Sequence, residues 1–201
     1  MGGDAEVSRF TRVTTDTSDL SRVVQRARQK RAAAEQPTLE LDSLFKGFSA
    51  SETGGESNPW LRTRVRPDGG STAFGPVQIT GTLFNDFHTR HPELFKGHED
   101  FVQKFQSQNE LFKRFGNEPE LPGYHPRYDY GGAGDYANDT DFQSSYNEVA
   151  RRIMEQRMRN RGVWPVPATE AGVRAAAGKW IGHEPDRGYM QRMLQSLGLT
   201  E

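Results

Sequence analysis

The segment from Ser49 to Thr80 reads SASETGGESNPWLRTRVRPDGGSTAFGPVQIT. An acidic residue, Glu52, is separated from the pair Gly54-Gly55 by Thr53 alone. The apolar residues before it recur at steps of three and four, which predicts one face of a helix; they are Leu39, Leu41, Leu44, Phe45 and Phe48. Because glycine readily adopts the left-handed conformation that ends a helix, we expect the helix to stop at this pair. Glu52 should therefore lie in the last turn, at the edge of the core.

Glycine, proline, asparagine and aspartate are frequent from residue 56 to residue 75. This composition predicts a loop or a small β-hairpin, with Asp68-Gly69-Gly70 as its turn. A compact cluster, Ser71 to Gln78, follows the turn. A carboxyl group beside an apolar core is desolvated, which raises its pKa and suits it to donate a proton to a glycosidic oxygen. An acid facing a glycine-rich segment that carries a glutamine is therefore typical of a site that cleaves a glycan strand.

The letters ETGGESNP and STAFGPVQIT resemble the first two motifs of the lysozyme-like lytic transglycosylases. The resemblance implies that Glu52 is the catalytic acid/base, with Thr53 in place of the usual serine. It also implies a substrate-binding role for four residues of the second motif: Ser71, Phe74, Gly75 and Gln78. Glu56-Ser57 is a rival match to the first motif, and we prefer Glu52 because it closes the helical periodicity and precedes the glycine pair.

The family's third motif, an Ala-Tyr-Asn-x-Gly-like segment, has two candidates. Tyr146-Asn147 has the right letters, but it lacks the glycine and falls within a charged helix. The segment from Ala175 to Gly182 has the small residues and the glycine, with Trp180 where Tyr or Asn might stand and Tyr189 further on. We favour the second segment and assign Trp180 and Tyr189 to substrate binding. Residues 91–164 are extra to the resemblance.

The rest of the chain is predicted to be mainly helical. We expect Pro76 to open a helix in its first turn, and Pro92 to break that helix and start another that continues to Phe115. Further helices are expected at about 140–161, 168–181 and 187–198. The predicted fold class is mainly α (α+β): a lysozyme-like domain over 39–201, with a small β-hairpin or irregular insert, and an extra region around 92–164. Residues 1–38 are predicted to form a basic, partly extended arm that docks on a larger assembly.

Composition limits the classes of function. The formal net charge of −1 lacks the basic excess that a nucleic-acid-binding domain carries, so we expect no nucleic acid as the main ligand. The chain has no cysteine, which excludes disulfides and thiolate metal sites. We expect no membrane span and no secretory signal, since neither kind of apolar run is present. His88, His91 and His98 lack a full set of metal ligands, so we expect no metal and no cofactor.

The resemblance implies a peptidoglycan lytic transglycosylase that works with one carboxylate. A lysozyme that hydrolyses the bond usually needs a second carboxylate, for which Asp68 is the candidate. A wall-lytic protein of this kind, without a signal peptide, is most similar to a phage virion component that acts on the host periplasm or cell wall during genome entry. We expect glycan strands and, through the arm, other virion or tail proteins as partners. The alternatives are a hydrolytic lysozyme or endolysin, and a structural tail or internal virion protein on a catalytically silent scaffold.

Overall fold

The computed structural model describes residues 21–25, 36–55, 60, 63–64, 73–116 and 139–200. The chain divides into two compact units, residues 1–36 and residues 37–201, each of which is described by itself. Of the first unit, residues 21–25 and residue 36 are described; residues 21–25 are helical and exposed, and they include Val23 and Val24. No helix among the described residues is long and apolar enough to cross a membrane.

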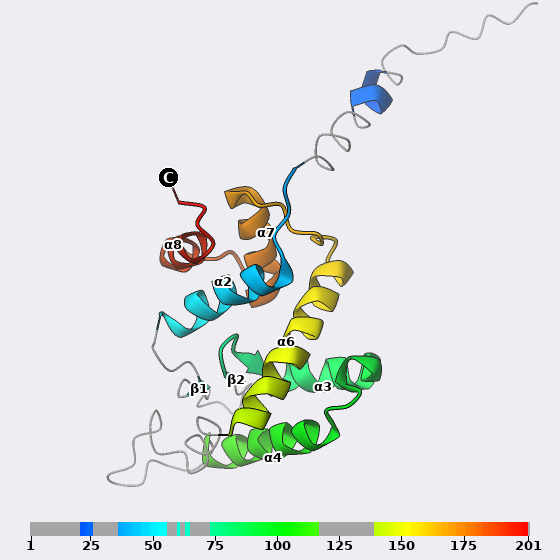
Figure 1. Cartoon of the computed structure of the whole chain (residues 1–201), viewed down its shortest axis with the longest axis vertical. Helices are drawn as coiled ribbons and strands as arrows, with labels where there is room; N and C mark the ends of the chain where they lie inside the picture. The colour runs from blue at the N-terminus through cyan, green and yellow to red at the C-terminus, as the bar shows by residue number, and fades with distance from the viewer. Residues whose placement is uncertain are drawn as a thin grey trace, which may run out of the picture. The chain divides into compact units, whose positions relative to one another are not determined.

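The described part of the second unit is mainly helical, as predicted. Its helices are α2 (Leu41–Thr53), α3 (Gly81–Arg90), the 3-10 helix η2 (Pro92–Phe95), α4 (Glu99–Gly116), α6 (Thr140–Asn160), α7 (Glu170–Ile181) and α8 (Arg187–Ser196). In Figure 1, α2, α7 and α8 form one group, α3, η2 and α4 form another, and the long helix α6 runs past both. Helix α2, which carries Glu52, is thus packed against α8 from the far end of the sequence.

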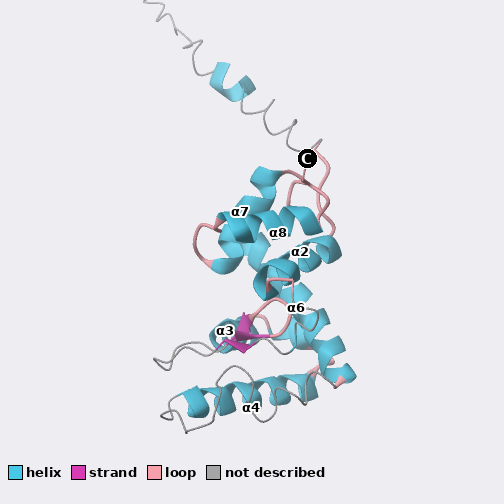
Figure 2. Ribbon diagram, turned by 90° about the vertical axis from the view of Figure 1, so that its left-hand side faces the viewer, coloured by secondary structure: helices cyan, strands magenta, loops and turns pink. Residues whose placement is uncertain are grey.

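Three short strands form a small antiparallel sheet beside α3 (Figure 2). They are β1 (Thr63–Arg64), β2 (Ala73–Phe74) and β3 (Ile79–Thr80), in the order β1-β2-β3. Thr63 pairs with Phe74, and Phe74 pairs in turn with Ile79. The first two strands flank the predicted turn at residues 68–70 as a hairpin would, while the turn itself lies outside the described residues. The third strand was not predicted.

Two helix predictions were wrong in their boundaries. Pro76 does not open a helix, because residues 75–78 form a turn that leads into β3. The helix begins instead at Gly81, where the side chain of Thr80 accepts a hydrogen bond from the Leu83 N–H and so caps the first turn. The helix expected from Pro92 to Phe115 is divided, since Gly97, with φ 82°, separates η2 from α4.

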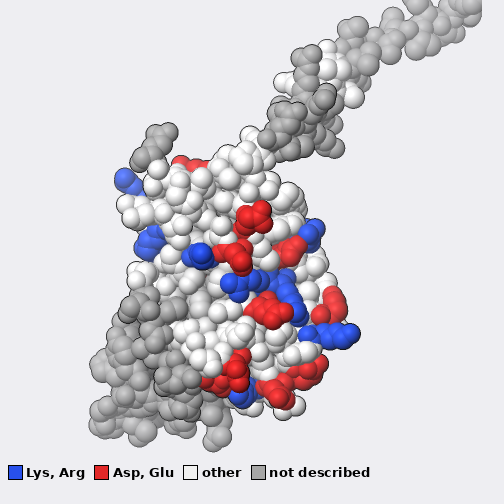
Figure 3. Space-filling model, viewed as in Figure 1, with Lys and Arg blue, Asp and Glu red and all other residues white. Residues whose placement is uncertain are grey.

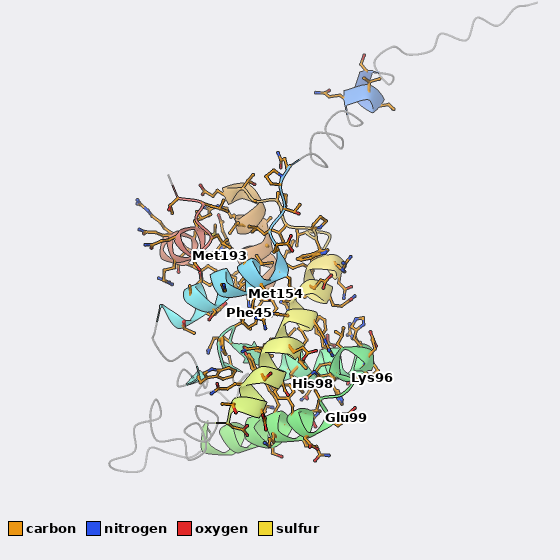
Figure 4. All side chains as sticks on the ribbon, viewed as in Figure 1. Phe45, Lys96, His98, Glu99, Met154 and Met193 are labelled. Atoms are coloured by element: carbon orange, nitrogen blue, oxygen red, sulfur yellow. The ribbon has the colours of Figure 1, made fainter. Side chains whose placement is uncertain are left out.

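The core of the second unit lies between α2, α6, α7 and α8 and continues under α3 and α4. Phenylalanine rings fill the α3–α4 side; the rings of Phe84 and Phe105 stack at 3.8 Å between centroids. Methionines fill much of the other side, and all four are at least 98% buried: Met154, Met158, Met190 and Met193. Figure 4 labels two of them, Met154 of α6 and Met193 of α8, near Phe45 of α2. Unbranched thioethers adapt to irregular gaps, which suits the junction of three helices.

Asp139 caps the start of α6, the helix that joins the two groups. Its Oδ1 accepts a hydrogen bond of 2.8 Å from the Phe142 N–H, and its Oδ2 accepts one of 2.8 Å from Lys104 of α4. The bond from Lys104, and after it the bond from the Phe142 N–H, hold the pKa of Asp139 below its usual value.

We expect Asp139→Ala to lower the free energy of unfolding by about 1 kcal/mol, because the cap is lost. Asp139→Asn keeps a capping oxygen and removes only the charge, so it should cost less. Because the folded-state pKa of Asp139 is lowered, the charge stabilises the fold above the unfolded-state value, and this gain is lost as the pH falls through the lowered pKa. Urea titrations at pH 7 and near pH 2.5 measure both effects; a difference between wild type and Asp139→Asn that grows on acidification would contradict the expectation.

Candidate active site around Glu52

Glu52 lies in the last turn of α2 and is 8% exposed. The helix ends where predicted, because Gly54 has φ 70° and its N–H donates to the carbonyl oxygen of Ala50. Leu44, Phe45 and Phe48 face the core, and each is at most 6% exposed. The apolar periodicity therefore carries the carboxyl group of Glu52 to the edge of the core. Glu56, the rival acid, lies outside the described residues.

Tyr189 of α8 holds the carboxyl group of Glu52 directly. Its hydroxyl donates a hydrogen bond of 3.0 Å to Glu52 Oε1. The main chain of Tyr189 is fixed at both ends: its N–H donates to Asp186 Oδ1 at 2.8 Å, and its carbonyl oxygen accepts from Ser51 Oγ at 3.1 Å. Tyr189 was predicted only to bind substrate, as a residue beyond the Ala175–Gly182 segment. It is in fact a direct hydrogen-bond partner of Glu52, the candidate acid.

Tyr146 of α6 lies close enough to Glu52 for the charge of Glu52 to act on it. The side chain is completely buried, and burial raises the pKa of Tyr146 well above its usual value. The nearby charge of Glu52 acts in the same direction, while the Ile79 N–H, which donates to the phenol oxygen at 3.3 Å, acts against it. Tyr146 therefore remains a neutral phenol at all physiological pH values. The ring of Trp60 packs edge-on against it, with 5.0 Å between centroids.

The turn of the second motif, Gly75 to Gln78, packs directly on Tyr146. Gly75 has φ 78°, and a Cβ atom built there would lie 2.6 Å from Tyr146 Cζ. Gln78 has φ 51°, an unusual value for a residue with a side chain, and its Nε2 donates to the Gly75 carbonyl oxygen at 2.9 Å. The structure thus links the second motif to Glu52 through Tyr146.

Three predicted residues remain to be placed: Trp180, Phe74 and Ser71. Trp180 is 6% exposed in the core, with its ring 5.5 Å from that of Phe48, one turn before Glu52. Phe74 forms part of β2, and Ser71 lies outside the described residues. Of the two candidates for a third motif, Tyr146 contacts Gly75 of the second motif and interacts electrostatically with Glu52. Trp180 of the other candidate packs on Phe48 in α2. The sequence preference for the Ala175–Gly182 segment is therefore not the one that the contacts favour.

The position of Tyr146 was hard to read from the sequence because it also belongs to a core pattern. It recurs with Phe142, Val149 and Ile153 at steps of three and four, and all four are buried. A tyrosine in such a pattern is indistinguishable from a packing residue until its hydroxyl is placed. Only the letters Tyr-Asn gave a separate signal.

The described residues contain no group of three or more His, Asp or Glu side chains that could hold a metal ion. His91 instead contacts Glu93 and His98 contacts Glu148. What the arrangement around Glu52 offers is proton transfer: one buried carboxyl group with a hydroxyl donor and a neutral phenol near it. Such a group can donate a proton and take it back.

Comparison with known proteins adds no relative. No protein-family model, no curated protein and no solved structure matches this chain. The resemblance to lytic transglycosylases therefore rests on the motif letters of the sequence.

Proposed function

We propose that this protein is a lysozyme-like lytic transglycosylase that cleaves peptidoglycan between N-acetylmuramic acid and N-acetylglucosamine, with Glu52 as the only acid/base. The observation that carries the proposal is the placement of Glu52: it is 8% exposed, accepts a hydrogen bond from Tyr189 and lies beside Tyr146, on which the second motif packs. Tyr189 thus contacts this carboxyl group from a distant part of the sequence, and the second motif is linked to it through Tyr146.

The surroundings of Glu52 suit a group that must change its protonation state during the reaction. Burial and the carbonyl end of α2 both favour the neutral acid, which donates the first proton. The hydroxyl of Tyr189 stabilises the carboxylate that is left behind.

The reaction needs no water and no second carboxylate. Glu52 gives its proton to the glycosidic oxygen as the bond from the muramyl C1 atom to that oxygen breaks. The carboxylate then takes the proton of the muramyl C6 hydroxyl, whose oxygen bonds to C1 and closes a 1,6-anhydro ring. Glu52 is thereby restored to the acid. Gln78 and Gly75 would contact the substrate, in keeping with the motif.

We also propose that the enzyme is a phage virion component that acts on the host periplasm or cell wall and attaches through its arm to other virion proteins. Two apolar residues of the arm support this: Val23 is 63% exposed and Val24 is 47% exposed, beside the basic residue Arg22. On the second unit, acidic and basic side chains are intermixed across the face in Figure 3, which does not favour a polyanion as partner.

A structural role on a catalytically silent scaffold is the second candidate function. The small exposed fraction of Glu52 favours it, because a glycan must reach the carboxyl group for the reaction to occur. A lysozyme that hydrolyses the same bond differs from the first proposal only in its product.

Analysis of the products separates these functions. Purified wild-type protein and Glu52→Gln are incubated with peptidoglycan sacculi, and the released muropeptides are measured by mass spectrometry. We expect anhydromuropeptides, each lighter by one water than the corresponding reducing product, from wild type alone. Reducing products from wild type would mean hydrolysis, and the absence of products from both proteins would support the structural role.

A further inference from the structure

Arg192 reaches the helix that carries Glu52 from the same face of α8 as Tyr189. The two residues are three positions apart, which places them one above the other on a helix. The Nη2 atom of Arg192 donates a hydrogen bond of 3.3 Å to the main-chain oxygen of Ser51, while Tyr189 donates to the Glu52 side chain. Helix α8 therefore holds two consecutive residues in the last turn of α2.

The hydrogen bond from Arg192 to Ser51 also places a positive charge at the carbonyl end of α2. The last carbonyl groups of a helix have no partner within it, and they carry partial negative charge. In α2 the Ala50 carbonyl is capped by the chain itself, but the last turn contains no basic residue of its own. Arg192 supplies that cation from a distant part of the sequence, at the residue next to Glu52.

The guanidinium group has one nitrogen, Nε, that is buried and makes no hydrogen bond within the described part of the chain. Gly188, one turn earlier, leaves room for it: a Cβ atom there would lie 3.4 Å from Arg192 Nη1 and 3.3 Å from Asp186 Oδ1. Ionisable groups that act on this end of α2 include Arg192 and Tyr189 from α8 and Tyr146 from α6.

We propose that Arg192 is a positioning residue for Glu52, which fixes the last turn of α2 and favours the carboxylate form through its charge. The carboxylate is the form that must accept the C6 proton in the second step, so this role rests on the proposed function. The hydroxyl of Tyr189 sets the direction of the carboxyl group, and Arg192 sets how readily that group loses its proton.

The test uses the full chain with ¹³C-labelled glutamate, and follows the side-chain carboxyl signal of Glu52 by NMR as the pH is changed. Glu52→Gln identifies the signal, because it alone disappears. Arg192→Gln removes the charge and keeps a neutral amide at about the position of Nε. We expect it to raise the titration midpoint of Glu52 by roughly half a unit to one unit. Arg187→Gln, at an exposed position on the same helix, is the matched control and should leave the midpoint unchanged.

Arg192→Lys keeps the charge and should restore a midpoint near that of wild type. An unchanged midpoint in Arg192→Gln would overturn the proposal. So would an equal rise in Arg192→Lys, and this second variant decides the matter if Arg192→Gln does not fold. The acid limb of the cleavage rate against pH should move with the NMR midpoint.

The two proposals fail separately. If Arg192→Gln raises the midpoint and wild type releases no muropeptides, Arg192 does influence the protonation of Glu52, but the proposed enzymatic function is refuted. If Arg192→Gln leaves the midpoint unchanged and wild type releases anhydromuropeptides, the proposed function stands and the role of Arg192 is refuted.

Discussion

Replacement of Glu52 by Gln is expected to reduce glycan cleavage by about three orders of magnitude, within the range that a general acid/base contributes. The amide cannot donate a proton to the glycosidic oxygen or accept one from the C6 hydroxyl. Its carbonyl oxygen can still accept the hydrogen bond from Tyr189, which is 3.0 Å from the carboxylate oxygen in the wild type. The geometry of the site should therefore persist while its chemistry is lost.

The same substitution should not destabilise the protein. A buried carboxylate at the carbonyl end of a helix is unfavourable for the fold, both because it is desolvated and because it faces the negative end of the helix dipole. We expect the free energy of unfolding at pH 7 to stay the same or to rise by up to about 1 kcal/mol, the usual size of a helix-dipole effect. Catalytic groups commonly show this trade between activity and stability.

Initial rates of muropeptide release and urea titrations measure the two effects together. Glu93→Gln is the matched control, since it makes the same change at a side chain that is 66% exposed in η2. Loss of stability in Glu52→Gln, with cleavage retained within tenfold, would identify Glu52 as a structural residue instead.

Gly75→Ala is expected to lower the free energy of unfolding by about 2–4 kcal/mol. Part of the cost is the positive φ of 78°, which disfavours a residue with a Cβ atom by roughly 1 kcal/mol. The rest comes from the contact of that Cβ with Tyr146, whose Cζ atom would be 2.6 Å away and whose ring is completely buried. Overpacking of this kind typically costs about 1–3 kcal/mol.

Activity should fall together with stability in Gly75→Ala. To relieve the contact, either the turn must move away with Gln78, or the ring of Tyr146 must shift. Gly97→Ala is a suitable control, because Gly97 has φ 82° and no atom within 4 Å of the added Cβ. The difference between the two variants, measured by thermal or urea unfolding, isolates the contact with Tyr146. Equal costs at both positions would show that this contact is absent.

Local patterns in the sequence predicted the elements well where one helix face or one turn residue decides the outcome. The periodicity before Glu52 and the pair Gly54-Gly55 predicted both the face and the end of α2. Pro76 failed as a helix start because its neighbours Gly75 and Gln78 both adopt positive φ and form a turn. A proline is compatible with either structure, so a single residue did not distinguish them.

The partners of Glu52 were harder to predict because they come from distant helices. The Tyr189 hydroxyl that donates to Glu52 belongs to a residue 137 positions away, and Tyr146 is 67 positions from its backbone partner Ile79. Such contacts depend on how far one helix is rotated and shifted against another, which periodicity along one helix does not fix. The motif letters therefore identified Glu52 as the candidate acid, and the packing of α6 and α8 on α2 determined which side chains lie near it.

The buried methionines of α6 and α8 also make oxidation a marker of molecules that have unfolded. Besides Met1, every methionine of the chain lies in the core, on α6 or α8, and is at least 98% buried. Oxidation turns a thioether into a polar sulfoxide, which this packed interior does not accommodate. Folded molecules shield these sulfur atoms from oxidants, and molecules that open expose all four at once. Sulfoxide at these positions thus marks the molecules that have been unfolded, and it hinders their return to the native state.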